Sequence, residues 1–430
     1  MIAEMTDIYP IFAYRTKYKS YMKKAIFLLV MMLQTLALDA QITLEECQQL
    51  ARENYPAIRQ YELVEQSRDF TLSNAATGYL PQISISGYGI WHSDIIKSQN
   101  LPLDMKNTLG VASVMVNQSI YDGGTIAANR QMARAQADVE QRQTDITLYD
   151  IRDRIQQLFF GILLIDERVK QNHLLQDDLN ISKSSVESLM KAGMANQSDI
   201  DAIQVQLIKA KQQESSLQTQ RRTYLSMLGI FISKELDENT SLTVPVEDSV
   251  LNRENNRPEL RLFEAQSLLA DAQRKQIDSR LMPKVGAFGL GMLNTGIGDL
   301  MKKEVFAAGL SLSWNIGALY TRKNDLRQIN IRKQQIDANR ETFLLNTRLQ
   351  TVNEEGNLKD LRNQVSQDEE IIRLSEQIRL ATQKKVEGGT ETVNELLRTV
   401  NAVSEARQQQ ALHQIQLLQE SYKLKHTLGN

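Results

Sequence analysis

Residues 151–169 read IRDRIQQLFFGILLIDERV, and their apolar residues recur alternately four and three positions apart. The residues that carry this spacing are Ile151, Ile155, Leu158, Ile162, Ile165 and Val169. Such a rhythm is typical of a helix that packs lengthwise against other helices. The surrounding stretch, 125–192, has no proline and one glycine, Gly161, so we expect a single unbroken helix. At 1.5 Å per residue this helix would extend on the order of 100 Å.

A second stretch, 318–387, has the same character, with no proline and one glycine, Gly356. Each of these helices would be several times longer than a small domain is wide, so neither can fold around one compact core. We therefore predict an elongated, mainly helical molecule whose function requires length.

The bulk composition excludes several classes of function. A formal net charge of -2 leaves no basic surplus for nucleic acid or an anionic membrane surface. Cys47 is the single cysteine, which excludes an internal disulfide and a cysteine-based metal site. The sequence contains no recognisable nucleophile–base set, metal-ligand cluster or phosphate loop. We expect no catalytic, cofactor-binding or metal-binding residue, and no enzyme activity.

The N-terminal residues 1–40 have the pattern of a signal peptide. Lys23 and Lys24 precede an apolar run, 25–38, and Ala40 is the expected last residue before cleavage. Met22 is an alternative start of the chain, and an N-terminal membrane anchor remains an alternative reading of the apolar run. Beyond residue 40 no apolar run is long enough for a transmembrane helix. We expect an exported protein.

The chain after residue 40 reads as two repeats of one pattern. The first repeat, 41–230, begins with a helix over about 44–78 that is interrupted at Asn54-Tyr55-Pro56, where Pro56 fits a helix start better than a helix interior. Thr43-Leu-Glu-Glu46 is its capping box. Two strands are expected at 82–91 and 111–121, followed by the helix 125–192, a turn and a returning helix over about 198–228.

The second repeat, 256–430, follows a polar connector, 231–255. Asn54-Tyr-Pro56 matches Asn256-Arg-Pro258, and Leu80-Pro81 matches Met282-Pro283, both at an offset of 202 (256 − 54 = 202; 283 − 81 = 202). Its helix is expected at about 256–280, its strands at 284–293 and 305–316, and its returning helix at about 392–428.

The strands of the second repeat alternate sharply between apolar and small or polar residues. We expect their apolar residues to face lipid, namely Phe288, Leu290, Met292, Phe306, Leu310, Leu312 and Trp314. A half-buried sheet in a soluble domain would show the same alternation and remains open. Four strands cannot close a membrane barrel, since small barrels need about eight. Membrane strands would therefore have to be pooled from several chains, and twelve strands from three chains would leave room for a conduit.

Each long helix ends at a glycine, Gly193 or Gly389, that is followed six residues later by an acid, Asp199 or Glu395. Glycine just beyond a helix end and a polar cap before the next helix predict a tight turn. We call these two turns, 192–199 and 388–395, the tips. Ser198 or Asn196 is expected to cap the first returning helix.

The order of these motifs resembles the TolC family of outer-membrane efflux proteins. The resemblance is carried by Thr43-Leu-Glu-Glu-Cys47, Gly78-Tyr-Leu-Pro81-Gln82, Gln118-Ser-Ile-Tyr-Asp-Gly-Gly124, Leu312-Ser-Trp-Asn-Ile-Gly317 and the two tips, and it extends over residues 41–430. It implies a homotrimer with a shared twelve-stranded outer-membrane β-barrel, four strands per chain, continuous with a long periplasmic α-helical barrel. It also implies the outer membrane of a Gram-negative bacterium as the location.

In function, the resemblance implies a passive exit duct of an efflux or type I secretion system. A periplasmic adaptor protein and an inner-membrane RND or ABC transporter would be its partners. A periplasmic coiled-coil scaffold or adaptor without a membrane barrel is the alternative. The resemblance identifies neither the exported substrate nor the class of pump.

The resemblance further implies a gate at the tips, with Gly193, Asp199, Gly389, Glu391 and Glu395 as candidate residues. Asp199 occupies the position of the family's gate aspartate, but Glu391 replaces its arginine partner and Val386 replaces a gate tyrosine. Asp199 and Glu391 would repel each other, so closure would need other contacts, such as Lys191, Lys384 or Lys385. Rings of these acids would attract cations; simple capping of helices by solvated acids is the alternative.

Overall fold

The computed structural model describes residues 42–91, 93, 108–246, 254–295 and 303–430. The expected signal peptide, 1–40, lies outside these residues. The elements follow in the order α2 (Leu44–Asn54), α3 (Arg59–Ala76), β1 (Gln82–Trp91), β2 (Thr108–Tyr121), α4 (Thr125–Lys191), α5 (Gln197–Ile232), α6 (Pro258–Ser279), β3 (Lys284–Thr295), β4 (Glu304–Ser313), α7 (Ala318–Glu387) and α8 (Val393–Leu428). Short 3₁₀ turns, η1 (Pro56–Ile58) and η2 (Thr77–Tyr79), flank α3.

The interruption predicted at residues 54–56 separates α2 from α3. Pro56 begins the turn η1, because proline has no N–H to donate and fits only the first turn of a helix. The strands differ slightly from expectation: β2 begins at Thr108, β3 continues to Thr295 and β4 ends at Ser313. The two long helices are continuous, and Gly161 and Gly356 interrupt neither of them.

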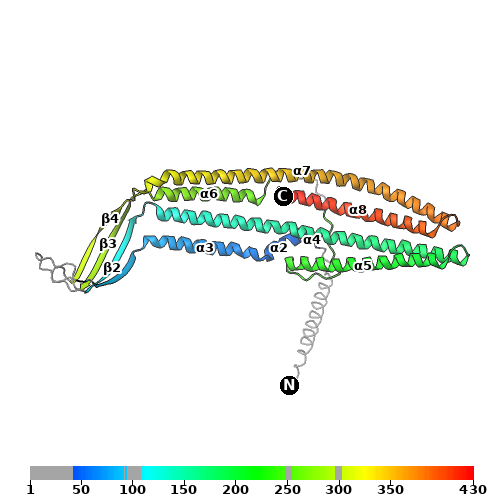
Figure 1. Cartoon of the computed structure of the whole chain (residues 1–430), viewed down its shortest axis with the longest axis horizontal. Coiled ribbons are helices and arrows are strands. Elements are labelled where there is room, and N and C mark those ends of the chain that lie inside the picture. The colour runs from blue at the N-terminus through cyan, green and yellow to red at the C-terminus, as the bar shows by residue number, and fades with distance from the viewer. Residues whose placement is uncertain (1–41, 92, 94–107, 247–253, 296–302) are drawn as a thin grey trace, which may run out of the picture. The chain divides into compact units, whose positions relative to one another are not determined.

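The four strands form one antiparallel sheet in the order β1-β2-β3-β4 (Figure 1). Each strand pairs with its neighbours in sequence, and the one irregularity in the register lies between Ser119 and Tyr121 of β2. Among the described residues, β1 and β4 pair on one side only, so the sheet has two free edges. α3 leads into β1 and α7 leaves β4, so these two helices lie at the edge strands.

The chain divides into two compact units, and each unit takes segments from both sequence repeats. Unit 1 comprises residues 1–51, 155–247 and 363–419, and unit 2 comprises 52–154, 248–362 and 420–430. The duplicated pattern in the sequence is therefore not a division into two independently packed domains.

In unit 1, part of the predicted stripe of α4 lies in the core: Ile155, Ile162 and Ile165 are buried, whereas Leu158 and Val169 are half-buried. Phe159, outside the predicted stripe, is also fully buried, and Leu179 and Val186 continue the buried side toward the tip. The connector after α5 packs back on this core through Arg221, which pairs with Asp166 at 2.5 Å and donates to the Thr240 carbonyl at 2.8 Å. Burying a phenylalanine or isoleucine side chain stabilises a fold by about 2 kcal/mol, so these residues, together with buried ones of α5 such as Ile203 and Leu225, stabilise this unit.

Cys47 lies in the same unit, in α2. Its side chain is fully buried, and burial raises the pKa of the thiol to about 12. A buried neutral thiol behaves as a small apolar side chain.

Polar contacts connect the neighbouring helices of unit 2, beside buried apolar residues such as Leu269 and Ile336. Lys275 and Gln276 of α6 bond to Gln131 and Asn129 of α4. α6 also pairs with α7 through Asp271–Lys333 at 2.7 Å and Asp278–Arg322 at 3.0 Å. α6 therefore lies between α4 and α7, in the same order as the strands β2, β3 and β4.

The end of α8 is anchored in unit 2 by an aromatic stack. The imidazole of His426 stacks on the ring of Tyr149 with their centroids 4.3 Å apart, and the Tyr149 hydroxyl donates to the His426 carbonyl at 2.6 Å. Arg257 lies over the same tyrosine ring at 5.1 Å. Burial, together with the nearby Arg257 and Arg152, lowers the pKa of His426 to about 4.

The glycines of the two long helices predict opposite responses to the same substitution. A Cβ at Gly161 would lie 2.6 Å from the Tyr224 ring, whereas a Cβ at Gly356 would meet nothing within 4 Å. Gly356→Ala should stabilise the protein by up to about 1 kcal/mol through helix propensity. Gly161→Ala should not give this stabilisation, because the new Cβ would force the Tyr224 ring to move. Thermal unfolding followed by circular dichroism in detergent measures both. Adding Tyr224→Ala should restore the gain at residue 161, and equal effects at both glycines would contradict this packing.

The stack at His426 predicts a pH dependence of stability. A histidine whose pKa falls from 6.5 to about 4 on folding stays neutral, so its contribution is complete above pH 6.5 and is lost as the pH falls toward 4. This loss amounts to about 3 kcal/mol. His426→Gln should remove that part of the pH dependence, measured as unfolding midpoints from pH 7 to pH 4. The matched control is His173→Gln at an exposed histidine, and a His426→Gln profile parallel to the wild type would refute the assignment.

Candidate functional site

The register of the sheet assigns each strand residue to one of two sides. Side A contains the pairs Ser86–Ser113, Phe288–Gly309 and Lys284–Ser313, and side B contains Ile85–Val114, Ala287–Leu310 and Val285–Leu312. Side B is the apolar side, and its side chains are largely exposed: Ile85 is 79% exposed, Phe306 81% and Leu310 76%. Exposed apolar side chains in a continuous group indicate a surface that meets something other than water.

The register corrects the expected set of lipid-facing residues. Phe288, Leu290 and Met292 pair with Gly309, Ala307 and Val305 and lie on side A, whereas Phe306, Leu310 and Leu312 lie on side B. The two strands each alternate as expected, but their apolar residues point to opposite sides of the sheet. The Phe288 ring covers Gly309, where an added Cβ would lie 3.1 Å from the ring. One surface cannot present both groups to lipid.

Side A is mixed: its polar side chains lie beside apolar ones such as Met115, Leu290 and Met292. The Ser86 and Ser113 hydroxyls are 2.8 Å apart and share a hydrogen bond across β1 and β2. Ser84, Asn117 and Ser311 lie on the same side. The polar residues of side A thus gather toward the end of the sheet next to the helices, whereas Phe288, Leu290 and Met292 form an apolar group with Met115.

The junctions between strands and helices are fixed by side-chain hydrogen bonds. The indole N–H of Trp314 donates to the Leu281 carbonyl at 2.9 Å, and the Gln118 amide donates to the Tyr79 carbonyl at 2.8 Å. Asp122 caps α4 by accepting from the N–H groups of Gly124 and Ile126. These bonds set the direction in which each helix leaves the sheet.

The two tips share one pattern of backbone hydrogen bonds. Gly193 has φ of 79° and donates to Met190, while the next N–H donates to Leu189. Gly389 has φ of 69° and donates to Val386, while the next N–H donates to Lys385. This is the Schellman end of a helix, which requires a left-handed residue at the glycine position.

The candidate gate acids form hydrogen bonds or ion pairs at the N-termini of the returning helices. Asp199 and Asn196 form a reciprocal capping box, with N–H to oxygen distances of 3.0 and 3.2 Å. Thr392 caps α8, where Glu391 accepts from the Thr392 N–H and Glu395 pairs with Arg398 at 2.5 Å. Within the described chain, neither Asp199 nor Glu391 forms an ion pair.

The helices that flank the two tips share one buried apolar cluster. Leu189 and Ile203 of the first hairpin and Val386 and Leu396 of the second belong to one buried group in unit 1. Val386, at the position where the family has a gate tyrosine, is therefore a core residue in this chain, with 5% of its surface exposed.

The described residues contain no group of His, Cys, Asp or Glu side chains that could hold a metal ion. Over the same residues, none of the helices combines the length and apolarity of a transmembrane helix.

Comparison with known proteins gives one family and one fold. Residues 252–430 match the family model "Outer membrane efflux protein". No curated protein sequence matches significantly. Among solved structures, the outer membrane protein VceC of Vibrio cholerae is 12% identical, with a TM-score of 0.68 over 90% of this chain and 96% of that one. The CusC channel is 13% identical, with a TM-score of 0.69 over 90% and 92%.

The outer membrane channel MtrE of Neisseria gonorrhoeae gives a TM-score of 0.65 at 14% identity, over 90% of this chain and 89% of that one. These likenesses extend over nearly the whole chain. The expected TolC-like fold, mainly helical with a small antiparallel sheet, is thereby confirmed.

The capping box at the first tip predicts different effects for two changes at one residue. Asp199→Asn keeps an acceptor for the Asn196 N–H, whereas Asp199→Ala removes it and should destabilise the first turn of α5 by about 1 kcal/mol. Amide hydrogen exchange at residues 197–200 should therefore be faster by roughly fivefold in Asp199→Ala and nearly unchanged in Asp199→Asn. Equal acceleration in both variants would show that the charge, and not the cap, holds this turn.

Proposed function

Residues 252–430 are an outer membrane efflux protein domain, and from this premise we propose that the chain is one subunit of a trimeric outer-membrane exit duct. The duct releases solutes that an inner-membrane RND or ABC pump delivers through a periplasmic adaptor protein. Its role is passive: the subunit supplies a sealed aqueous path, and the pump supplies the energy.

The observation that carries this proposal is the sheet with two free edges and a bare apolar side B. In lipid, every backbone N–H and C=O must be paired, so a four-stranded sheet can be stable there only as part of a closed barrel. Three copies supply twelve strands, with β4 of each copy pairing with β1 of the next. Side B then faces lipid and side A faces the lumen.

The helices next to the free edges support the same arrangement. α3 and α7 of unit 2 carry exposed apolar side chains: Leu63 is 61% exposed and Phe70 67% on α3, and Leu349 is 61% and Val352 62% on α7. The two helices present different surfaces, so a contact between them joins copies head to tail. Such a contact closes into a ring when its rotation allows. The ring continues the barrel as a wall of helices.

The tips form the periplasmic end of the duct in this proposal. Gly193 and Gly389 turn the chain back, and Asp199 and Glu391 give each subunit two acids at that end without an ion pair among the described residues, whereas Glu395 is paired with Arg398. Three subunits would concentrate negative charge around the opening and favour cations. The reversal potential of the duct, compared between wild type and Asp199→Asn, measures this preference; an anion preference of the wild type would reject it.

Neighbouring positions on β4 give a direct test of which side meets lipid. In a Cys47→Ser background, Leu310→Cys on side B should be protected from a hydrophilic maleimide in proteoliposomes, because lipid covers it. Ser311→Cys is its matched control, since it lies one residue away on side A and should react from the lumen. Light scattering of the same detergent-solubilised protein should give three chains per particle. A monomer in which both cysteines react would favour a soluble scaffold instead.

A further inference from the structure

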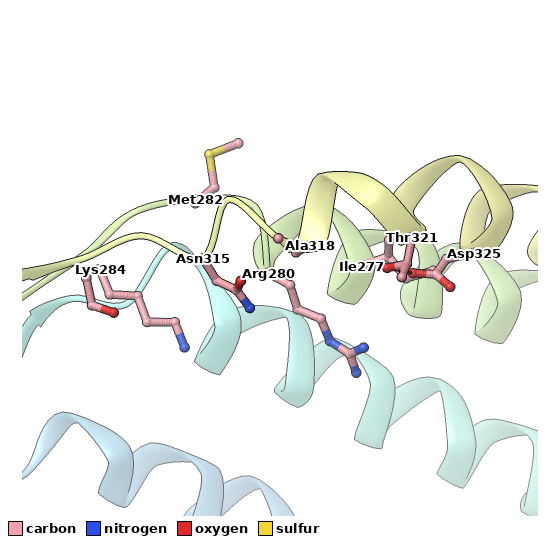
Figure 2. A pocket seen from close by; sticks show the side chains of 10 residues that line it. Ile277, Arg280, Met282, Lys284, Asn315, Ala318, Thr321 and Asp325 are labelled. Atoms are coloured by element: carbon pink, nitrogen blue, oxygen red, sulfur yellow. Dashed lines mark hydrogen bonds between the residues drawn. The ribbon is translucent and has the colours of Figure 1, made fainter.

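A hollow of about 440 Å³ lies in unit 2, where α6 meets β3 and β4 meets α7. Its polar lining consists of Arg280, Lys284, Ser313, Asn315, Thr321 and Asp325. Figure 2 shows the Arg280 and Lys284 side chains extending toward the same side, with the Asn315 amide between them in that view. A volume of this size is in the range of small-molecule sites.

The two cations of this hollow lack ionic partners. Over the described residues, the side chains of Arg280 and Lys284 form neither an ion pair nor a hydrogen bond. The nearby Arg322, by contrast, forms an ion pair with Asp278. Asp325, the one acid in the lining, accepts a hydrogen bond from the Thr321 hydroxyl at 3.0 Å. The hollow therefore contains two cationic groups whose donors remain available.

The position of Lys284 connects the hollow to side A of the sheet. Lys284 pairs with Ser313, so both lie on side A, opposite the bare apolar residues of side B. Among the described strand residues, Lys284 is the single charged residue on side A. A solute that moves along side A thus meets its only strand charge at the end next to the helices.

We propose that this hollow is a binding site for a phosphate- or sulfonate-bearing solute. The guanidinium of Arg280 presents a planar fork of donors that matches an oxyanion, and the Lys284 ammonium adds a second positive charge. The Asn315 amide and the Ser313 and Thr321 hydroxyls supply neutral donors around them. The source of the oxyanion is a soluble solute, since side A faces the lumen in the proposed duct.

This site adds a solute class to the proposed function, and its placement around the solute path rests on that function. In a trimer, three such hollows would surround the path where the helical part joins the barrel, and the duct would retain anionic solutes there. Binding itself requires only one chain, because every lining residue belongs to the same subunit.

Titration calorimetry with inorganic tripolyphosphate tests the site in the full-length protein, in neutral detergent and at low ionic strength. The wild type should bind one tripolyphosphate per chain, with an affinity that falls as salt is added. Arg280→Gln with Lys284→Gln should weaken binding at least tenfold. The control, Lys323→Gln with Arg340→Gln, removes the same two kinds of charge from exposed positions of α7 and should change affinity less than twofold.

A second variant guards against misfolding. The double variant Arg280→Lys with Lys284→Arg keeps both positive charges and should retain tripolyphosphate binding. If only the neutral variant loses binding, the loss is due to the missing charge. Equal weakening in the exposed control pair, or no saturable binding to the wild type, would overturn the site. So would a short-chain phosphatidylglycerol that binds more tightly than glycerol phosphate, because a hollow on side A should not prefer the lipid.

Light scattering on the same samples separates the two proposals. A monomer that binds tripolyphosphate would refute the duct and leave the site standing. A trimer without saturable binding would refute the site and leave the duct standing.

Discussion

The pairing of backbone polar groups is the constraint on which this architecture depends. A sheet of four strands leaves the N–H and C=O groups of β1 and β4 unpaired on their outer edges. Water could satisfy those groups on a soluble sheet, but side B then exposes an apolar surface that includes Ile85, Phe306 and Leu310. A closed barrel shared between copies satisfies both requirements at once, because the edges pair and the apolar side faces hydrocarbon. The helices next to the edge strands are then brought together by the same contact.

The internal duplication extends beyond the sequence into hydrogen bonding. Each tip uses the same two backbone bonds around a left-handed glycine, although the residues around Gly193 and Gly389 differ. The caps differ in chemistry: Asn196 and Asp199 form a reciprocal box, whereas Thr392 caps the other helix. A tight turn between two helices needs these roles, and several residue types can fill them. This tolerance explains how the two tips keep one backbone pattern while their side chains differ.

The sequence predicted the elements well and their relation to one another less well. Proline and glycine fix helix ends by local sterics, so the bounds of α7 and the order of the strands could be read directly. The alternation of apolar and polar residues within one strand also follows from the sequence. This alternation does not determine the register in which two strands pair. A shift of one residue exchanges the sides, and for that reason Phe288 and Phe306 were expected together and lie apart. The hollow at Arg280 and Lys284 was missed because its lining comes from a helix end, two strands and another helix start, which no single motif contains.

The bonding at the tips also determines how that end of the chain can deform. The turn bonds of Gly193 and Gly389 are local to each hairpin, and both hairpins share one apolar cluster that includes Val386 and Leu396. Separating the hairpins of one chain would expose this cluster to water, whereas separating whole chains would leave it intact. The tip end of the chain is therefore one block of four helices that share a buried cluster. In the proposed trimer, widening the opening would then move whole chains against one another, with the folded chain as the smallest moving part.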